Sequence, residues 1–134
     1  MSTVLIIDDD REMVRLLRTL FELEGFQVAT VSSYDEVLPT CRRVRPDAIL
    51  MDVRLRGRET LDLARQIRRE EGLASVPLIM TSGMNCRHAC LEAGADIFLL
   101  KPFLPDELVR TVQGLLSQPS RQAHPSGATS SAGS

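Results

Sequence analysis

Acidic residues in two places have the types and the spacing that could do chemistry. Asp8 opens a run of three aspartates and Asp52 stands alone further along, and each follows directly after apolar residues. Carboxylates gathered at one edge of a fold repel each other, and a hard divalent cation removes that conflict. Mg²⁺ suits such a set, because it is usually held by one or two carboxylates while it keeps several waters. The run of aspartates could instead cap a helix. Capping accounts for Asp10, but it does not explain the presence of Asp52.

An alternation of strand-like and helix-like segments must position these side chains. Short apolar runs predict strands buried on both faces, at residues 4–7, 27–31, 47–51, 76–80 and 97–100. Apolar residues at helical spacing predict helices at residues 13–21, 34–44, 58–70, 87–93 and 105–116. Parallel neighbours need crossover connections, which cover both faces of the sheet. The sequence therefore predicts an α/β fold, a flavodoxin-like doubly wound five-stranded parallel sheet of order 2-1-3-4-5 with five helices.

The ends of the predicted strands also carry two further polar candidates. In doubly wound folds, ligands bind beyond the carboxyl ends of the strands. Ser82 follows the fourth predicted strand, and Lys101 follows the fifth. Lys101 has a simpler interpretation as a surface residue, but its place between the apolar run and a proline favours a role in the same site as Asp52.

Length and composition limit the classes of protein that fit. The chain has 134 residues, 43% of them hydrophobic, which suits one domain with one buried core. A formal net charge of −2 argues against the broad basic surface of a nucleic-acid binder. There is no run of about eighteen apolar residues and no leader pattern, so we expect a soluble, cytoplasmic protein without membrane insertion. We expect a folded domain at 1–117, and the small, polar, aperiodic residues 118–134 should form a disordered tail or the start of a linker.

The cysteines raise a second possible metal site. Cys41, Cys86 and Cys90 are an odd number of cysteines in a chain with no export signal, which indicates reduced thiols. His88 stands between two of them, but on a helix it lies two positions from each and faces away from both. No further ligand pair is evident, so we interpret these residues as ordinary helix positions.

Four short motifs resemble those of the response-regulator receiver family (CheY-like) of two-component signalling systems. They are, in chain order, Ile6–Asp10, Asp52 after its apolar run, Ser82–Gly83 and Lys101–Phe103. The resemblance covers residues 3 to about 117. One such motif would carry little weight, but four in the family's order, each after the strand it should follow, favour membership.

The resemblance implies a role for each residue of the set. Asp52 would accept a phosphoryl group. The Ser82 hydroxyl and the Lys101 ammonium would bind the phosphoryl oxygens and assist the transfer. Mg²⁺ would be the cofactor, held by Asp8, Asp9, Asp52 and the backbone carbonyl of Arg54.

The implied function is that of a single-domain response regulator in phosphorelay signal transduction. A histidine kinase or phosphotransfer protein would donate the phosphoryl group, and the signal would pass to a protein partner without direct contact with nucleic acid. Such a phosphoprotein catalyses only its own phosphorylation and dephosphorylation, so it is not an enzyme with a separate substrate. In the switch, Ser82 would be drawn to the phosphate and Phe98 would follow inward, as a two-state population shift. A plain core position is the alternative for Phe98.

Three segments depart from the family's usual pattern. After the acceptor the family commonly has Leu-Pro-Gly, an acidic residue and Gly, whereas this chain continues from Leu55 with Arg56–Thr60. That loop should differ in stiffness, and its arginines at 54, 56 and 58 make it basic, although we favour a solvated surface. Between Ser82 and Gly94 the chain is about one helical turn short, which predicts a short or displaced fourth helix. Pro39 should kink the second helix or start a shorter one.

Alternatives from other classes remain. Val4–Asp10 also fits the opening of haloacid-dehalogenase-type phosphatases, enzymes in which Asp8 would be the nucleophile. That scheme leaves Asp52 idle and needs a later strand that ends in paired acids, whereas Asp106 and Glu107 stand where the macrodipole of a helix explains them. A degenerate receiver that binds partners without phosphorylation is disfavoured by the complete set of site residues. A flavodoxin shares the fold, but the acidic cluster would repel the phosphate of a flavin.

Overall fold

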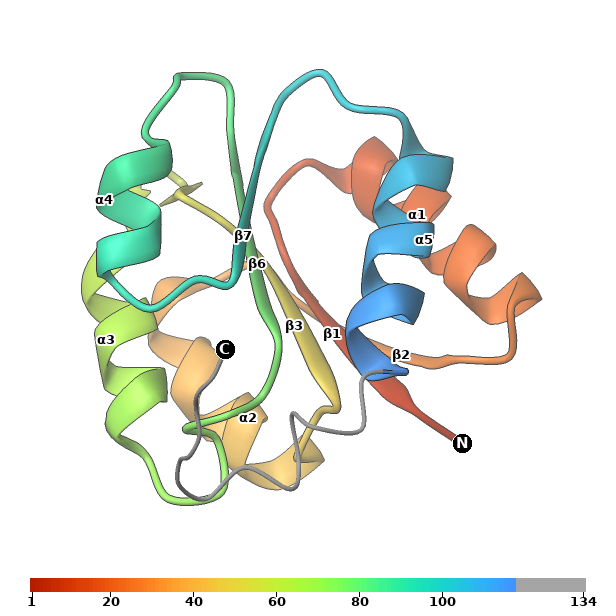
Figure 1. The fold of residues 1–134 in the computed structure, drawn as a ribbon, viewed down its shortest axis with the longest axis horizontal. Coiled ribbons are helices and arrows are strands. Elements are labelled where there is room, and N and C mark those ends of the chain that lie inside the picture. The colour runs from red at the N-terminus through yellow and green to blue at the C-terminus, as the bar shows by residue number, and fades with distance from the viewer. Residues whose placement is uncertain (118–134) are drawn as a thin grey trace, which may run out of the picture.

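Five parallel strands form the central sheet of the structure, a computed structural model that describes residues 1–117. The strands are Thr3–Ile7 (β1), Gln27–Val31 (β2), Ala48–Asp52 (β3), Leu78–Ser82 (β6) and Ile97–Leu100 (β7). Their order is β2-β1-β3-β6-β7, which confirms the predicted 2-1-3-4-5 arrangement (Figure 1). Each neighbouring pair is parallel, so all the strands end at the same edge of the sheet.

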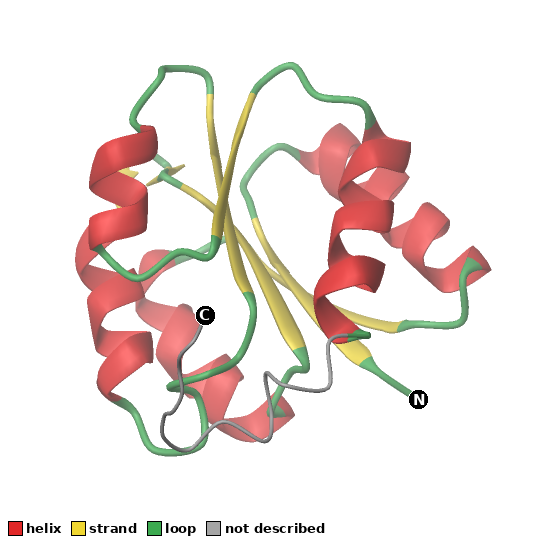
Figure 2. Ribbon diagram, in the orientation of Figure 1, coloured by secondary structure: helices red, strands yellow, loops and turns green. Residues whose placement is uncertain are grey.

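Helices cover both faces of this sheet, as predicted (Figure 2). They are Arg11–Leu23 (α1), Val37–Val44 (α2), Leu61–Arg69 (α3), Arg87–Glu92 (α4) and Pro105–Leu116 (α5). α1 and α5 lie over one face, and α2, α3 and α4 lie over the other. β1 sends Val4 and Ile6 to the first face and Leu5 and Ile7 to the second; all four are fully buried, which explains the continuous apolar run. Within residues 1–117 no helix is both long enough and apolar enough to cross a membrane.

Several element bounds differ from those predicted. The helix predicted at 34–44 is a short 3-10 turn, Tyr34–Glu36 (η1), followed by α2. Pro39 stands in the first turn of this shorter α2, where its missing N–H leaves no intrahelical bond unmade. The fourth strand runs two residues further than predicted, because its last two polar residues, Thr81 and Ser82, still pair with β7. α4 has only six residues, so the expectation of a short fourth helix is confirmed.

A two-stranded hairpin replaces the predicted start of the third helix. Arg54–Leu55 (β4) and Arg58–Glu59 (β5) pair antiparallel. The turn residues Arg56 and Gly57 both have positive φ, 50° and 85°. Two successive left-handed residues are typical of the turn whose twist matches a hairpin. α3 therefore begins at Leu61, three residues later than predicted.

The hairpin is anchored on its neighbours rather than loose in solvent. Leu55 is 1% exposed and belongs to the core between the sheet and α2–α4. The guanidinium carbon of Arg58 lies 3.7 Å from the centre of the Tyr34 ring, and an Arg58 nitrogen lies 3.5 Å from Oδ1 of Asp35. A buried leucine on one strand and a stacked arginine on the other hold the hairpin next to η1.

One guanidinium joins two loops at the edge of the sheet where β6 and β7 begin. Arg68 of α3 donates hydrogen bonds to the carbonyls of Val76 and Gly94, both at 2.7 Å, and to Oδ2 of Asp96 at 2.8 Å. Asp96 Oδ2 also accepts the amide of Leu78 at 2.8 Å. Gly94 has a φ of +116°, and a Cβ there would lie 2.5 Å from Cγ of Arg68, so this close approach requires glycine. The loops before β6 and β7 are thus held as one unit.

Candidate functional site

The carboxyl ends of four strands bring the predicted site residues to one place. Asp8 follows β1, Asp52 ends β3, Ser82 ends β6 and Lys101 follows β7. The Lys101 ammonium donates to Oδ2 of Asp52 at 2.8 Å and to Oδ2 of Asp8 at 3.3 Å. The Lys101 amide donates to the carbonyl of Ser82 at 2.8 Å, which fixes the lysine beside the end of β6. Residues from four separate parts of the sequence thus meet at this edge.

Three carboxylates lie within reach of one cation. One oxygen from each of Asp8, Asp9 and Asp52 lies within 4.8 Å of the others. The amide of Asp10 donates to Oδ1 of Asp8 at 2.9 Å, and a hairpin amide, that of Arg56, donates to Oδ2 of Asp9 at 2.7 Å. Backbone amides therefore orient the carboxylates of Asp8 and Asp9. Asp10 does not share this role, because its side chain accepts a first-turn amide and caps α1, as the sequence indicates.

The electrostatics of the cluster suit a divalent cation. Asp8 is only 8% exposed, and its burial raises the pKa of its carboxyl although the Asp10 amide and Lys101 oppose that rise. Burial lowers the pKa of Lys101, but the hydrogen bond to Asp52 and the charge of Asp8 outweigh it, so this pKa is raised on balance. One ammonium thus faces two carboxylates, with Asp9 close by. Oxygen ligands with an excess of negative charge are the donor set that Mg²⁺ prefers.

The loop after Asp52 lies beside its carboxylate. The amide of Arg54 donates to Oδ1 of Asp52 at 3.2 Å. The residue whose carbonyl was expected to complete the metal ligands is therefore next to the acid. Its side chain turns into the hairpin, where it donates to the carbonyl of Gly57 at 3.3 Å.

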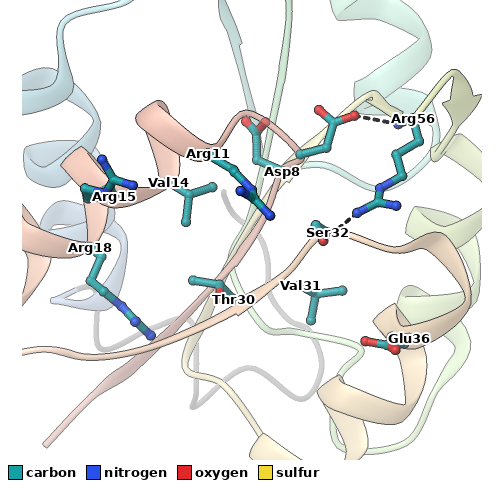
Figure 3. A pocket seen from close by; sticks show the side chains of 11 residues that line it. Asp8, Arg11, Val14, Arg15, Arg18, Thr30, Val31, Ser32, Glu36 and Arg56 are labelled. Atoms are coloured by element: carbon teal, nitrogen blue, oxygen red, sulfur yellow. Dashed lines mark hydrogen bonds between the residues drawn. The ribbon is translucent and has the colours of Figure 1, made fainter.

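A pocket lies next to Asp8 and Asp9, between α1, β2 and the hairpin (Figure 3). Its volume is about 500 Å³. Arg56 lines this pocket and donates to Oγ of Ser32 at 3.4 Å. Its charged lining consists of Asp8, Asp9, Glu36 and four arginines, Arg11, Arg15, Arg18 and Arg56. The basic character predicted for the hairpin loop therefore extends along α1.

Thr60 is a residue of the site that the sequence did not indicate. It precedes α3 as the N-cap residue and is fully buried, yet its side chain makes no capping bond. Its hydroxyl instead donates to the carbonyl of Asp52 at 2.7 Å, and its amide donates to the carbonyl of Val53 at 2.7 Å. A threonine before an apolar helical pattern is normally interpreted as a cap, so nothing in the sequence distinguishes this use.

Thr60→Val is expected to destabilise the protein by about 1 kcal/mol, because it removes one buried hydrogen bond and leaves the Asp52 carbonyl without that donor. Valine has nearly the shape of threonine, so packing changes little. Urea unfolding measures the free energy of unfolding, and Thr60→Ser is the matched control that keeps the hydroxyl. Equal stability of the valine variant and the parent would show that the Thr60 hydroxyl does not stabilise the Asp52 backbone.

Ser82 and Phe98 lie on the adjoining strands. Ser82 is 9% exposed, and its hydroxyl accepts the amide of Met84 at 3.0 Å. Phe98 of β7 pairs with Met80 of β6, is 4% exposed, and packs in the core between the sheet and α2–α4. In this conformation Phe98 is a buried core residue.

The acids near the start of α5 are helix-terminus charges. Asp106 and Glu107 stand in its first turn after Pro105, which occupies the start of the helix. Within residues 1–117 the sheet has no strand after β7 that could carry the acid pair of a phosphatase.

Sequence comparisons point to one family. The family model of the response regulator receiver domain matches residues 4–113. The DNA-binding response regulator MtrA of Mycolicibacterium paratuberculosis is 34% identical over 113 residues, which cover 84% of this chain and 50% of MtrA. The transcriptional regulatory protein PrrA of Mycobacterium tuberculosis is 34% identical over 131 residues, covering 97% of this chain and 56% of PrrA. The chain thus spans about half the length of the curated relatives it matches.

A solved structure agrees with this result. The receiver domain of the sensor histidine kinase PA1611 from Pseudomonas aeruginosa PAO1, which has a magnesium ion coordinated in its active-site cleft, has a TM-score of 0.78 and 29% identity to this chain. The similarity covers 87% of this chain and 98% of that one. The strand order, the residues gathered at the strand ends and the family match all agree, and the chain belongs to the response regulator receiver domain family of two-component signalling.

Proposed function

We propose that this chain is a Mg²⁺-dependent switch that accepts a phosphoryl group on Asp52 and is read by a protein partner. The observation that carries the proposal is the 2.8 Å contact between the Lys101 ammonium and Asp52, with oxygens of Asp8 and Asp9 within 4.8 Å of an Asp52 oxygen. A nucleophilic carboxylate, a cation beside it and further acids for a metal are the parts that phosphoryl transfer to an aspartate needs. Receiver domains as a family are phospho-accepting switches, which supports this assignment.

The chain's own groups would supply positioning and charge. An Asp52 oxygen attacks the phosphorus in line while the bond from phosphorus to the donor's leaving atom breaks. The Lys101 ammonium neutralises charge on the phosphoryl oxygens, and the Ser82 hydroxyl is a second donor at the end of β6. Asp8, Asp9, Asp52 and the Arg54 carbonyl would hold Mg²⁺, which would supply further neutralisation of the phosphoryl charge. Hydrolysis of the acyl phosphate returns the Asp52 carboxylate.

The switch would link this site to the surface made by α4, β7 and α5. Ser82 turns from the Met84 amide, its partner at 3.0 Å, toward the phosphoryl oxygens. Phe98 follows inward, and the phosphate acts only because it binds one of the two states better. Phenylalanine has no hydroxyl, so the change would be transmitted by packing of the ring alone.

A histidine kinase or phosphotransfer protein is the phosphoryl donor in this proposal, and the output is contact with another protein. MtrA is named as a DNA-binding regulator, but this chain covers 50% of its length, and the net charge of −2 does not favour contact with DNA here. We propose residues 1–117 as the receiver domain. The expected tail, 118–134, lies outside the described residues.

Asp8→Asn is expected to raise the melting temperature of the metal-free protein. Burial raises the pKa of the Asp8 carboxyl in the folded protein above its value in the unfolded chain. The stability that the protonated carboxyl contributes is therefore full below the pKa of the unfolded chain, and it is lost as the pH rises through the pKa of the folded protein. At neutral pH the ionised carboxylate therefore destabilises the fold, and each kcal/mol relieved is worth roughly 4 °C. Calorimetry should also show a smaller response to MgCl₂ in the variant than in the parent. An unchanged response would remove Asp8 from the metal site.

Intact-mass analysis after incubation with acetyl phosphate, with and without Mg²⁺, tests the proposal. The expected result is a single phosphoryl adduct that requires Mg²⁺ and that borohydride reduction and peptide mapping assign to Asp52. An adduct on Asp8 would instead support the phosphatase alternative. If neither acetyl phosphate nor a phosphohistidine donor gives an adduct, the protein is instead a module that binds partners without phosphorylation.

A further inference from the structure

Two thiols meet at the start of α4. The sulfurs of Cys86 and Cys90 lie 3.9 Å apart. Cys86 is the N-cap residue of α4, and its carbonyl accepts the amide of Cys90 at 3.0 Å, so the first helical turn brings the pair together. His88 points away from them, as predicted, and its Nε2 lies 3.2 Å from Glu92. Within residues 1–117 no group of three or more possible metal ligands includes this pair.

The two thiols differ in their access to water. Cys90 is fully buried in the core, whereas Cys86 is partly exposed at its edge. Burial raises the pKa of the Cys90 thiol to about 12, and the neighbouring Cys86 adds to the rise. A dissolved oxidant therefore meets Cys86 first, while Cys90 remains next to it as a protonated thiol. Cys41, also fully buried, lies in α2 and has no such neighbour among the described residues.

We propose that Cys86 and Cys90 form a redox modification site, which a small peroxide converts to an intramolecular disulfide. The Cys86 thiolate attacks one oxygen of hydrogen peroxide, the O–O bond breaks, and the departing hydroxide becomes water, which leaves a sulfenic acid on Cys86. The Cys90 sulfur then attacks the Cys86 sulfur; the S–S bond forms as the S–O bond breaks, and the Cys90 proton leaves with the hydroxide as a second water. Two thiols are oxidised, and one peroxide is reduced by two electrons.

The geometry makes this bond attainable at the helix end. A disulfide has sulfurs about 2.05 Å apart, so the 3.9 Å separation must close by about 1.9 Å. Residues four apart inside a helix hold their Cβ atoms about 5–6 Å apart, too far for a disulfide, whose Cβ atoms are about 3.8 Å apart. Cys86 is not inside the helix: its φ of −123° and ψ of 36° are non-helical. A Cβ placed on Gly83, three residues earlier, would have no atom within 4 Å, so the segment between Ser82 and α4 is not closely packed at that point.

Oxidation would act on the segment that follows Ser82. The amide of Met84 bonds the Ser82 hydroxyl at 3.0 Å, and Cys86 lies two residues further along. If the proposed function holds, a disulfide restrains the segment that moves when Ser82 turns toward the phosphate. The modification site itself does not depend on Asp52, so the two proposals can fail separately.

The test is a count of free thiols in the full chain after treatment with hydrogen peroxide at about equimolar concentration. The treated protein is denatured in the presence of an alkylating reagent, which labels every free thiol, and its intact mass is then measured. The expected result is the loss of two hydrogen atoms with one alkylated cysteine, mapped to Cys41, and full reversal by dithiothreitol. The Cys41→Ser and Asp52→Asn variants should form the same bond.

Two variants separate the roles of the thiols. Cys86→Ser should show no loss of two hydrogens and keep both remaining thiols. Cys90→Ser should trap a sulfenic acid on Cys86 that dimedone labels, and a melting curve checks that this buried substitution leaves the protein folded. If the parent keeps three alkylated thiols while a small-thiol standard is fully oxidised, or if its disulfides join two chains or include Cys41, the proposal is overturned.

Discussion

Asp52→Asn is expected to lose the phosphoryl adduct completely under conditions in which the parent protein is fully labelled. The amide has nearly the shape of the carboxylate, and its oxygen can still accept a hydrogen bond from Lys101, the partner of Asp52 at 2.8 Å. It lacks the negative oxygen that attacks phosphorus, and it is a weaker ligand for Mg²⁺. Intact mass after incubation with acetyl phosphate and Mg²⁺ measures the result.

Asp62→Asn is the matched control for this prediction. Asp62 is an exposed carboxylate in the first turn of α3, where it pairs with Arg65 at 2.6 Å. Its removal should change stability by less than about 0.5 kcal/mol and leave labelling unchanged. Both variants should melt as single folded species. Labelling that survives in folded Asp52→Asn would show that the acceptor is another residue.

Lys101→Ala is expected to slow labelling by acetyl phosphate about a hundredfold, the order of effect seen when one preorganised donor to a developing charge is removed. The ammonium lies 2.8 Å from Asp52 and 3.3 Å from Asp8, so its loss removes the cation that offsets both carboxylates. We expect the adduct still to map to Asp52, because the nucleophile is unchanged.

Added Mg²⁺ compensates for part of the missing positive charge. The rate of adduct formation is therefore compared between the variant and the parent with both proteins at saturating MgCl₂. Lys101 is the only lysine in the sequence, so this variant removes every lysine ammonium from the protein. Arg110→Ala, which removes an exposed cation from α5, is the control and should label at the parent rate. If Lys101→Ala is no slower than this control, the lysine is a structural partner of the acids and not part of the transfer chemistry.

The sheet and the collection of acids at its edge could be predicted from the sequence because each rests on a local pattern. Strands such as β1 are buried on both faces, which forces a continuous apolar run. Parallel strands in the order 2-1-3-4-5 place the ends that carry Asp8, Asp52 and Lys101 along one edge of the sheet, with the ends of the first and third strands adjacent.

The hairpin and the role of Thr60 could not be predicted, because they depend on tertiary contacts. Arg56 adopts a left-handed backbone that arginine rarely takes, and its amide bonds Asp9, a residue 47 positions away. The hydroxyl of Thr60 bonds a strand carbonyl instead of its own helix, which only the packed structure reveals. The proximity of the two cysteines could have been inferred, since Cys90 follows four residues after Cys86, the residue that precedes α4.

The guanidinium of Arg68 sets up a difference in amide hydrogen exchange between the start of β6 and the segment that follows this strand. At the beginning of this strand, the Leu78 amide is bonded to Asp96, which Arg68 holds in turn, so it should exchange with solvent only when the whole domain unfolds. Two residues past the other end, the Met84 amide bonds only a serine hydroxyl, and it should exchange through brief local opening. A segment that opens easily beside a firmly held strand can change its contacts repeatedly without endangering the fold.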